Sequence, residues 1–367
     1  MFTEKHFPNS VTGKELDVYL ENAWYRMGLS IFTCHFLFFE NSLYSPIWLR
    51  LPLDGLVLRK SLQKNLRQNR QRFRTIVRQG VIDEEKEGLY QLYKSNFRGR
   101  LSATIQDSIL DGQPTNIFDT FEVCVYDGER LVGFSFFDLG NTSLASIKGV
   151  YDPDYARFSL GIYTMAEEIQ FGIDLGFQFY YPGYIVPGYL RFDYKLRMGR
   201  SEDVQFFDLK TRGWQAMSHF SSQNIPVGVL SGKLNRIGQA LADAEIAVQM
   251  LYYPAYEANT FPYEQERFLE SPLFLTLFNN VFPRPRFIIY YDLWSEQYLF
   301  THCMPVEDLG LYFEYTMQFD TKEARHFLDF ILKKTQIIET QDMQAIVQLA
   351  VEINGLIKPP GLWGILK

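Results

Sequence analysis

The order of apolar and polar residues changes its period along the chain, and each change predicts a different element. Residues 121–126 and 131–137 alternate like strands and flank an Asp-Gly-Glu-Arg turn, which is typical of a β-hairpin. Residues 144–151 continue the alternation. Residues 161–175 then show helical spacing, and the aromatic run 177–181 predicts another strand. Three antiparallel strands, a crossover helix and a neighbouring strand predict an α/β fold with a mixed sheet.

Further elements are predicted on both sides of this unit. Before it we expect a helix at 13–27, extended segments at 31–40 and 46–51, a basic strand-helix element at 59–79, and helices at 83–97 and 101–112. After the polar stretch 221–231 we expect a helix at 233–250, a hairpin of 287–293 with 297–303, and helices at 321–333 and 340–353.

The segment 146–195 carries the strongest chemical signal. A strand runs into the turn at Asp152 and Asp154, and Gly161 opens the helix close behind Ser159. Unpaired N–H groups at a helix start attract anionic or carbonyl oxygen, and glycine lets the main chain approach closely. We therefore expect a device for holding an acyl donor, in an N-acetyltransferase-like (GNAT) core. The alternative is an ordinary helix start, with the two aspartates as turn and N-cap residues.

These patterns divide the chain of 367 residues into three predicted parts. Residues 1–58 form an N-terminal segment packed on the core, and residues 59–224 form the acyltransferase-like core. Residues 225–367 form a C-terminal α+β extension whose role the sequence does not indicate.

Composition narrows the class of protein. Aromatic residues make up 16% of the chain, enough to line pockets as well as to build cores. No run of about eighteen uncharged apolar residues occurs, so we expect no membrane span and a cytoplasmic location. Cys34, Cys124 and Cys303 lie far apart, so we expect neither a metal site nor a disulfide framework.

Positive charge is concentrated in one segment of an acidic chain. The net charge is −7, yet eight basic residues and no acid lie between positions 59 and 78. They are Arg59, Lys60, Lys64, Arg67, Arg70, Arg72, Arg74 and Arg78. Such a segment is typical of contact with a phosphate backbone. A solvated basic helix face is the alternative.

The segment from Tyr151 to Lys195 resembles the C-terminal core of arginyl-tRNA–protein transferases and their bacterial leucyl relatives. The similar motifs are a Tyr-Asp-Pro turn, a Ser-Leu-Gly-x-Tyr helix start, a Tyr-Tyr-x-Gly-Tyr strand and an Asp-Tyr-Lys segment. Their residues are Tyr151 to Pro153, Ser159 to Gly161 with Tyr163, Tyr180 and Tyr181 with Gly183 and Tyr184, and Asp193 to Lys195. The resemblance covers residues 25–202, about half of the chain.

This resemblance implies an enzyme that moves an aminoacyl group from tRNA to the α-amine of a protein N-terminus. The implied partners are aminoacyl-tRNA and a protein or peptide acceptor, without a membrane. An activated ester and an amine of pKa about 7.7–8.0 need positioning and a nearby base rather than a strong nucleophile. The candidate catalytic residues are Asp152, Tyr181 and Lys195. The candidate substrate-binding residues are Tyr151, Asp154, Ser159, Gly161, Tyr163, Tyr180, Tyr184 and Tyr194, and those for tRNA are Arg59, Lys60, Arg67 and Arg70.

The chain also departs from the family pattern. The family's N-terminal cysteine cluster is reduced to Cys34, and one thiolate cannot hold a metal or an iron–sulfur centre. Ile162 stands in place of a threonine, and Pro182 in place of a leucine. We therefore expect no cofactor. Two alternatives stay open: an acetyl-CoA-dependent N-acetyltransferase, although its pyrophosphate loop needs more glycines, and a non-catalytic binding module.

Overall fold

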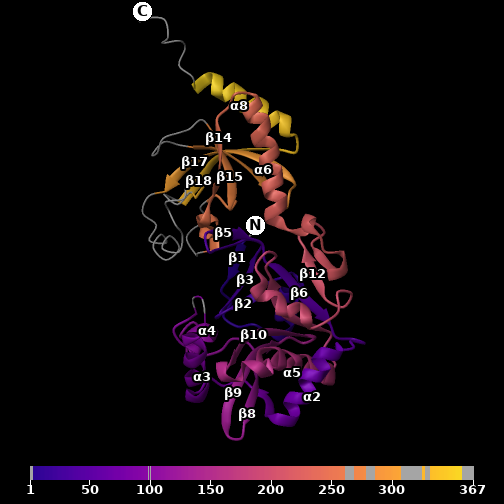
Figure 1. Cartoon of the computed structure of the whole chain (residues 1–367). Helices are drawn as coiled ribbons and strands as arrows, with labels where there is room; N and C mark the ends of the chain where they lie inside the picture. The colour runs from indigo at the N-terminus through magenta and orange to yellow at the C-terminus, as the bar shows by residue number, and fades with distance from the viewer. Residues whose placement is uncertain are drawn as a thin grey trace, which may run out of the picture. The chain divides into compact units, whose positions relative to one another are not determined.

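The computed structural model describes residues 3–97, 99, 101–260, 268–277, 286–306, 325–326 and 331–357. Its contacts divide the chain into two compact units (Figure 1). The larger unit comprises 5–33 and 46–220, and the smaller comprises 1–4, 34–45 and 221–367. The main part of the smaller unit thus begins at residue 221, four residues before the predicted boundary at 225. The three-part division itself stays a prediction.

The larger unit is built on one eight-stranded mixed sheet. Its strand order is β13-β12-β6-β11-β10-β9-β8-β7. The bounds are β6 Ile47–Pro52, β7 Arg74–Gln79, β8 Thr120–Asp127, β9 Arg130–Leu139, β10 Ser143–Tyr151, β11 Phe179–Ile185, β12 Gln205–Asp208 and β13 Gly213–Ala216. Every neighbouring pair is antiparallel except β10 and β11, which are parallel. The α/β class with a mixed sheet is confirmed.

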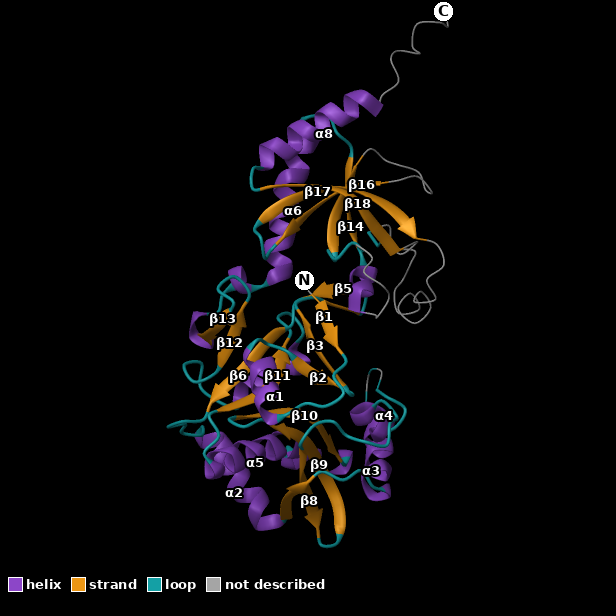
Figure 2. Ribbon diagram, turned by 180° about the vertical axis from the view of Figure 1, so that it is seen from behind, coloured by secondary structure: helices purple, strands orange, loops and turns teal. Residues whose placement is uncertain are grey.

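Helices cover both faces of this sheet (Figure 2). Successive side chains of a strand point to opposite faces, and β8 shows this clearly. Val123 and Val125 pack in one core with α2 (Lys60–Arg72) and α5 (Leu160–Leu175). Cys124 packs in a second core with α3 (Glu84–Ser95) and α4 (Ile105–Leu110). The two faces are called the α5 face and the α3 face below.

Local sequence signals explain where these helices begin and end. The Asp83 side chain accepts a hydrogen bond from the backbone of Lys86 and so caps α3. Gly176, at φ 76°, closes α5 in the left-handed conformation. The predicted helix 13–27 was too long, because α1 (Gly13–Glu21) is followed by Ala23 at φ 59° and the strand β2 (Tyr25–Met27). The basic element is a helix followed by a strand, α2 and β7, rather than the reverse.

Short elements complete the first half of the chain. They are β1 Thr3–His6, β3 Ser30–Cys34, β4 Leu37–Phe39 and β5 Ser42–Tyr44, with the 3-10 helices η1 Pro153–Phe158, η2 Leu190–Arg197, η3 Met217–His219 and η4 Ser222–Asn224.

The smaller unit contains a five-stranded antiparallel meander. The strands are β14 Val248–Tyr252, β15 Leu273–Leu277, β16 Arg286–Asp292, β17 Gln297–Val306 and β18 Ile331–Thr340, in that order. The helices α6 (Pro226–Asp243) and α8 (Met343–Ile357) pack on each other and on these strands, and η5 spans Pro254–Thr260. The predicted hairpin and the last helix are confirmed.

Two predictions in this unit were wrong. The helix expected at 233–250 ends at Asp243, and its last three positions begin β14. The helix expected at 321–333 overlaps β18 at 331–333, while most of it lies outside the described residues. In both places a short apolar run fits either period, and pairing within the meander decides for the strand.

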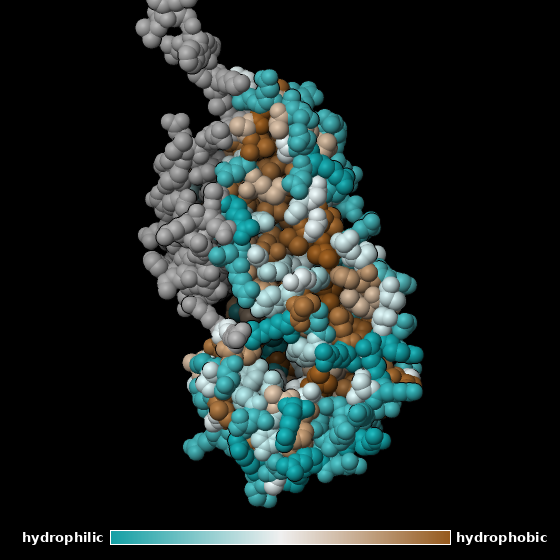
Figure 3. Space-filling view, viewed as in Figure 1, coloured by the Kyte–Doolittle hydropathy of each residue, from teal (hydrophilic) through white to brown (hydrophobic). Residues whose placement is uncertain are grey.

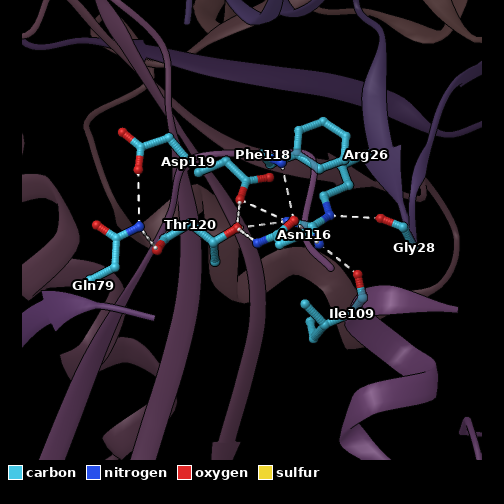
Figure 4. A network of polar contacts seen from close by, with 9 residues as sticks. Arg26, Gly28, Gln79, Ile109, Asn116, Phe118, Asp119 and Thr120 are labelled. Atoms are coloured by element: carbon cyan, nitrogen blue, oxygen red, sulfur yellow. Dashed lines mark hydrogen bonds and ion pairs between the residues drawn. The ribbon is translucent and has the colours of Figure 1, made fainter. Parts of the chain in front are cut away.

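A buried arginine joins β2 to the large sheet (Figure 4). The Arg26 guanidinium donates to Asp138 Oδ1 and Thr120 Oγ1 at 2.8 Å each, and to the carbonyl of Ile109 at 2.5 Å. Its Nε donates to the carbonyl of Gly28 at 2.7 Å. Both charged side chains are almost fully buried, so each needs the other as its counter-ion.

Replacing Arg26 by Met should destabilise the chain by about 3–5 kcal/mol, because the Asp138 carboxylate would stay buried without a counter-ion. Urea unfolding measures the loss. The double variant Arg26→Met with Asp138→Leu should recover much of it, since no charge then remains buried. A single variant within about 1 kcal/mol of the parent would contradict this account.

The visible surface of the larger unit is mainly hydrophilic (Figure 3). Among the described residues, no helix has the length and apolar character needed to cross a membrane.

Candidate active site

The parallel strands β10 and β11 pair over only three residues each. Ser143, Leu144 and Ala145 lie opposite Phe179, Tyr180 and Tyr181. Beyond these positions, β10 continues to Tyr151 with β9 as its partner, and β11 continues to Ile185 with β6 as its partner. The sheet therefore opens between 146–151 and 182–185. We call this opening the splay.

Each strand carries an irregularity where the splay begins. On β10 the register shifts between Ser146 and Lys148, and on β11 it shifts between Tyr180 and Gly183. Extra residues of this kind bend a strand and increase its twist. Gly183 has φ 90°, a conformation that glycine adopts readily. These two bends explain why β10 and β11, which pair at 143–145 and 179–181, separate beyond those residues.

A fully buried carboxyl lies beneath the splay on α5. Glu168 Oε1 accepts from the Ser135 hydroxyl at 2.5 Å, and Oε2 accepts from the Tyr180 hydroxyl at 2.7 Å. Burial raises the pKa of Glu168 to about 7, although the hydroxyls of Ser135, Tyr180 and Ser146 oppose the shift. Glu168 was not among the predicted site residues. The available signal was an acid at a position that the helical period places on the sheet-facing side of α5.

Lys195 contacts the end of β11, residues 182–185, which no longer pairs with β10. It comes from η2, and its ammonium donates to the carbonyl of Tyr184 at 2.9 Å. The rings of Tyr184 and Phe192 lie 5.0 and 5.4 Å from it. A Cβ at Gly183 would lie 3.0 Å from the ammonium, so the glycine leaves room for it. Burial lowers the pKa of Lys195 to about 7.

The end of β10 meets the start of α5. Carbons of the Tyr151 ring lie 3.7 Å from the position of a Cβ on Gly161, and the Tyr93 ring meets that of Tyr151 edge-on at 5.5 Å. Ser159, at φ 54°, precedes the helix without capping it through its side chain. The first amides of α5 have no intrahelical acceptor. Tyr194 is 38% exposed, yet burial raises the pKa of its phenol to about 12, and the nearby Tyr93, Glu168 and Tyr151 add to the rise.

The predicted aspartates occupy the adjacent turn. Asp152 is fully buried, forms an ion pair with Arg130, and accepts from the amide of Asp154 at 3.0 Å. Asp154 is exposed. The contacts of Asp152 are those of a turn and cap residue, and they do not indicate a role in acyl transfer. The catalytic role of Asp152 stays a prediction.

The predicted tyrosines do not gather in one place. Tyr180 reaches the buried Glu168 on the α5 face. Tyr181 packs edge-on against Tyr25 and Trp214, and burial raises its pKa to about 12. The hydroxyl of Tyr163 meets Thr75 Oγ1 at 2.6 Å, on the edge strand β7 and three strands away from β10. The structure thus brings Tyr151, Tyr180, Tyr184, Tyr194 and Lys195 to the splay.

The basic segment divides into a paired and an unpaired half. Arg70 bonds Glu167 through two nitrogens, at 2.7 and 2.6 Å. Ion pairs also join Arg72 to Asp127, Arg74 to Glu129 and Arg78 to Glu122. Lys60, Lys64 and Arg67 are exposed on α2 and form no ion pair within the described part of the chain.

A shallow hollow of about 630 Å³ adjoins the unpaired half. Its polar lining is Gln63, Arg67, Arg70, Gln71 and Gln170, from α2 and α5. Arg59 caps the start of α2 without a side-chain hydrogen bond and is near enough to Asp203 to lower the pKa of that carboxyl, after the larger effect of Arg200.

Residues 68–205 match the family described as "Arginine-tRNA-protein transferase, C terminus". Over this segment the chain is similar to that family. The segment runs from α2 to the first residue of β12 and therefore contains the whole splay, α5 and Lys195. Lys60, Lys64, Arg67 and all residues after 205 lie outside the match.

Curated relatives agree with the transferase match. An "Aspartate/glutamate leucyltransferase" of Leptospira interrogans is 25% identical over 194 residues, which are 52% of this chain and 74% of the relative. A protein of the same name from Acinetobacter baumannii is 34% identical over 77 residues, 21% of this chain and 28% of the relative.

Solved structures resemble this chain weakly. A C-terminal domain of a putative lysylphosphatidylglycerol synthetase from Agrobacterium fabrum has a TM-score of 0.31 and 14% identity, covering 38% of this chain and 46% of its own. The structure titled "Crystal structure of FemX" has a TM-score of 0.32 and 10% identity, covering 50% and 64%.

Replacing Glu168 by Gln should alter how stability depends on pH. The folded protein holds a proton on Glu168 up to about pH 7, whereas the unfolded chain releases it near 4.5. This group's contribution to stability is therefore present below about pH 4.5 and is lost as pH rises towards 7. Glutamine removes that loss, so the variant should gain up to roughly 3 kcal/mol relative to the parent between pH 5 and pH 8.

Urea unfolding of both proteins at the two pH values measures the change. Glu129→Gln is the matched control, because the Glu129 side chain is 99% exposed. An equal difference between parent and Glu168→Gln at both pH values would contradict the raised pKa.

Proposed function

We propose that this transferase moves an aminoacyl group from tRNA to the α-amine of a protein N-terminus, at the splay. The observation that carries the proposal is that the segment matching the family places Lys195 and the start of α5 at the opening between β10 and β11. Names of the relatives make leucine the first donor to test, and aspartate and glutamate the first acceptors.

The donor end would lie on the α5 face. Its ester carbonyl is polar, and the first amides of α5 at Leu160 and Gly161 can donate to an oxygen there. The ring of Tyr151 beside Gly161 offers a flat surface for the terminal nucleoside. The strand, loop and helix order around the splay also supports the finer assignment of an N-acetyltransferase-like core. No cofactor is needed, since the ester is already activated.

Lys195 is suited to take a proton from the acceptor amine. With a pKa of about 7, a useful fraction of it is neutral near neutrality, so it can accept the proton that an α-ammonium must lose. The free amine then attacks the ester carbon, the new C–N bond forms and the C–O bond to the ribose breaks. One of the two protons on the attacking nitrogen goes to the departing ribose oxygen, and the other stays on the nitrogen of the new amide. Lys195 returns its proton to water.

The exposed cations of α2 would contact tRNA phosphates. Lys60, Lys64 and Arg67 form no ion pair within the described residues, so they can replace counterions of the nucleic acid at little cost. Arg70, already held by Glu167, is the weaker member of the predicted tRNA set.

The function is tested by offering labelled aminoacyl-tRNAs together with peptides that differ in their first residue. Transfer from one donor to one class of first residue is expected. Saturable binding of acetyl-CoA, without any transfer from tRNA, would favour the alternative N-acetyltransferase.

Lys195→Met should lower kcat/KM for transfer by at least about 100-fold, the usual contribution of general base catalysis. The parent's rate should rise with pH through about 7 as the ammonium loses its proton. In Lys195→Met and in Lys195→Arg, which keeps a charge but cannot act as a base, the midpoint of the rise should move up to the pKa of the acceptor amine itself, about 7.7–8.0. Lys210→Met, on an exposed lysine, is the control. An unaltered pH profile in Lys195→Met would exclude the base role.

The triple variant Lys60→Gln, Lys64→Gln, Arg67→Gln should weaken tRNA binding and lower the slope of log K against log salt by about 2–3. Filter binding at several salt concentrations measures both effects. The double variant Arg72→Gln, Arg74→Gln should change the slope less, because acids already pair with those residues. Equal slopes in the triple variant and the parent would remove α2 from the tRNA interface.

A further inference from the structure

Two lysines at the splay have no carboxylate partner among the residues that the structure describes. Within the described part of the chain, the ammonium of Lys195 donates to the carbonyl of Tyr184 and forms no ion pair, and Lys148, on β10, forms none either. Both are half-buried, and burial lowers the pKa of each. Arg70 and Arg78 of the basic segment, by contrast, pair with acids whose side chains are almost fully buried. A half-buried cation without a counter-ion is costly to the free protein, and an incoming anion relieves that cost.

Lys148 lies on the α3 face. In the antiparallel pair β9–β10 it is opposite Phe136, and Val150 is opposite Phe134. Directly opposed residues share a face, and these three apolar side chains belong to the core of α3 and α4. The ammonium of Lys148 lies 5.5 Å from the ring centre of Tyr90, a residue of α3. Its position on that face is therefore established by register and by contact.

The two faces of the splay differ in what they offer a ligand. The α5 face holds the start of α5, and α2 packs against α5 there, so the phosphate-bearing donor is assigned to that side. The α3 face offers Lys148, one bulge beyond the last residue of β10 that pairs with β11. An acceptor that meets the donor carbonyl from the opposite face brings its first side chain towards Lys148.

We propose that Lys148 binds the side-chain carboxylate of the acceptor's first residue and so selects acidic N-termini. The assignment rests on the proposed function and adds the residue that determines specificity. In aspartate, a single methylene separates the carboxylate from the Cα that bears the reacting amine. Lys148 would hold that carboxylate while Lys195 takes the proton from the amine. The two lysines then have separate tasks, one in recognition and one in proton transfer.

The test measures peptide binding to the full chain without donor. Fluorescent eight-residue peptides that begin with Asp or with Asn, and are otherwise identical, are titrated with the parent and with Lys148→Met, and Kd is read by anisotropy. The parent should bind the Asp peptide at least about tenfold more tightly than the Asn peptide, the usual value of a hydrogen bond to a charged group. In Lys148→Met the ratio should fall to about one.

Variants with matched chemistry complete the design. Lys148→Arg keeps the cation and should retain most of the preference, whereas Lys148→Glu should reverse it in favour of Asn. Lys14→Met, on an exposed lysine of α1, should leave the ratio unchanged. Unchanged binding of the Asn peptide to Lys148→Met shows that the variant is folded.

Three results would overturn the assignment. They are equal binding of the two peptides by the parent, a preference that survives in Lys148→Met, and no measurable binding of the Asp peptide at millimolar concentration. Because the measurement uses neither tRNA nor turnover, a protein that transfers nothing can still show the lysine-dependent preference. Failure of the proposed function and failure of this inference are thus read from different experiments.

Discussion

The short parallel pairing between β10 and β11 is the constraint on which the rest of the larger unit's site depends. Three residues on each strand pair, and an irregularity follows on each strand at once. Hydrogen bonding to β9 and β6 keeps the two strands in the sheet while their facing edges separate. The opening is therefore held from both sides by antiparallel pairing.

Buried polar groups fix the geometry beneath and beside this opening. Glu168 is held by hydroxyls from β9 and β11, so the carboxyl ties α5 to both strands that flank β10. Arg26 serves the same purpose farther along the sheet, where it joins β2 to Asp138 and Thr120. Each group is satisfied almost entirely by partners from other elements, and such networks specify one arrangement of the elements they join.

The distribution of charge partners separates structural cations from those available to ligands. Arg26, Arg70 and Arg78 each bond a carboxylate whose side chain is almost fully buried. Lys148 and Lys195 lie at the splay and have no carboxylate partner within the described residues. The eight basic residues of 59–78 look alike in the sequence, yet the fold assigns half of them to acids on neighbouring strands and helices.

The sequence by itself determined the local elements of the core and the family that this core resembles. Alternation of apolar and polar residues predicted β8, β9 and β10, and the helical period predicted α5. The motifs from Tyr151 to Lys195 carried the resemblance. All of these signals depend only on residues that are close in the chain. Only the tertiary structure decided which tyrosines meet Lys195, that Asp152 pairs with Arg130, and that Glu168 lies beneath the splay. It also turned 248–250 and 331–333 into strands. Those outcomes depend on strand register, on the face of the sheet to which a side chain points, and on partners distant in the chain. A local sequence pattern determines none of these three.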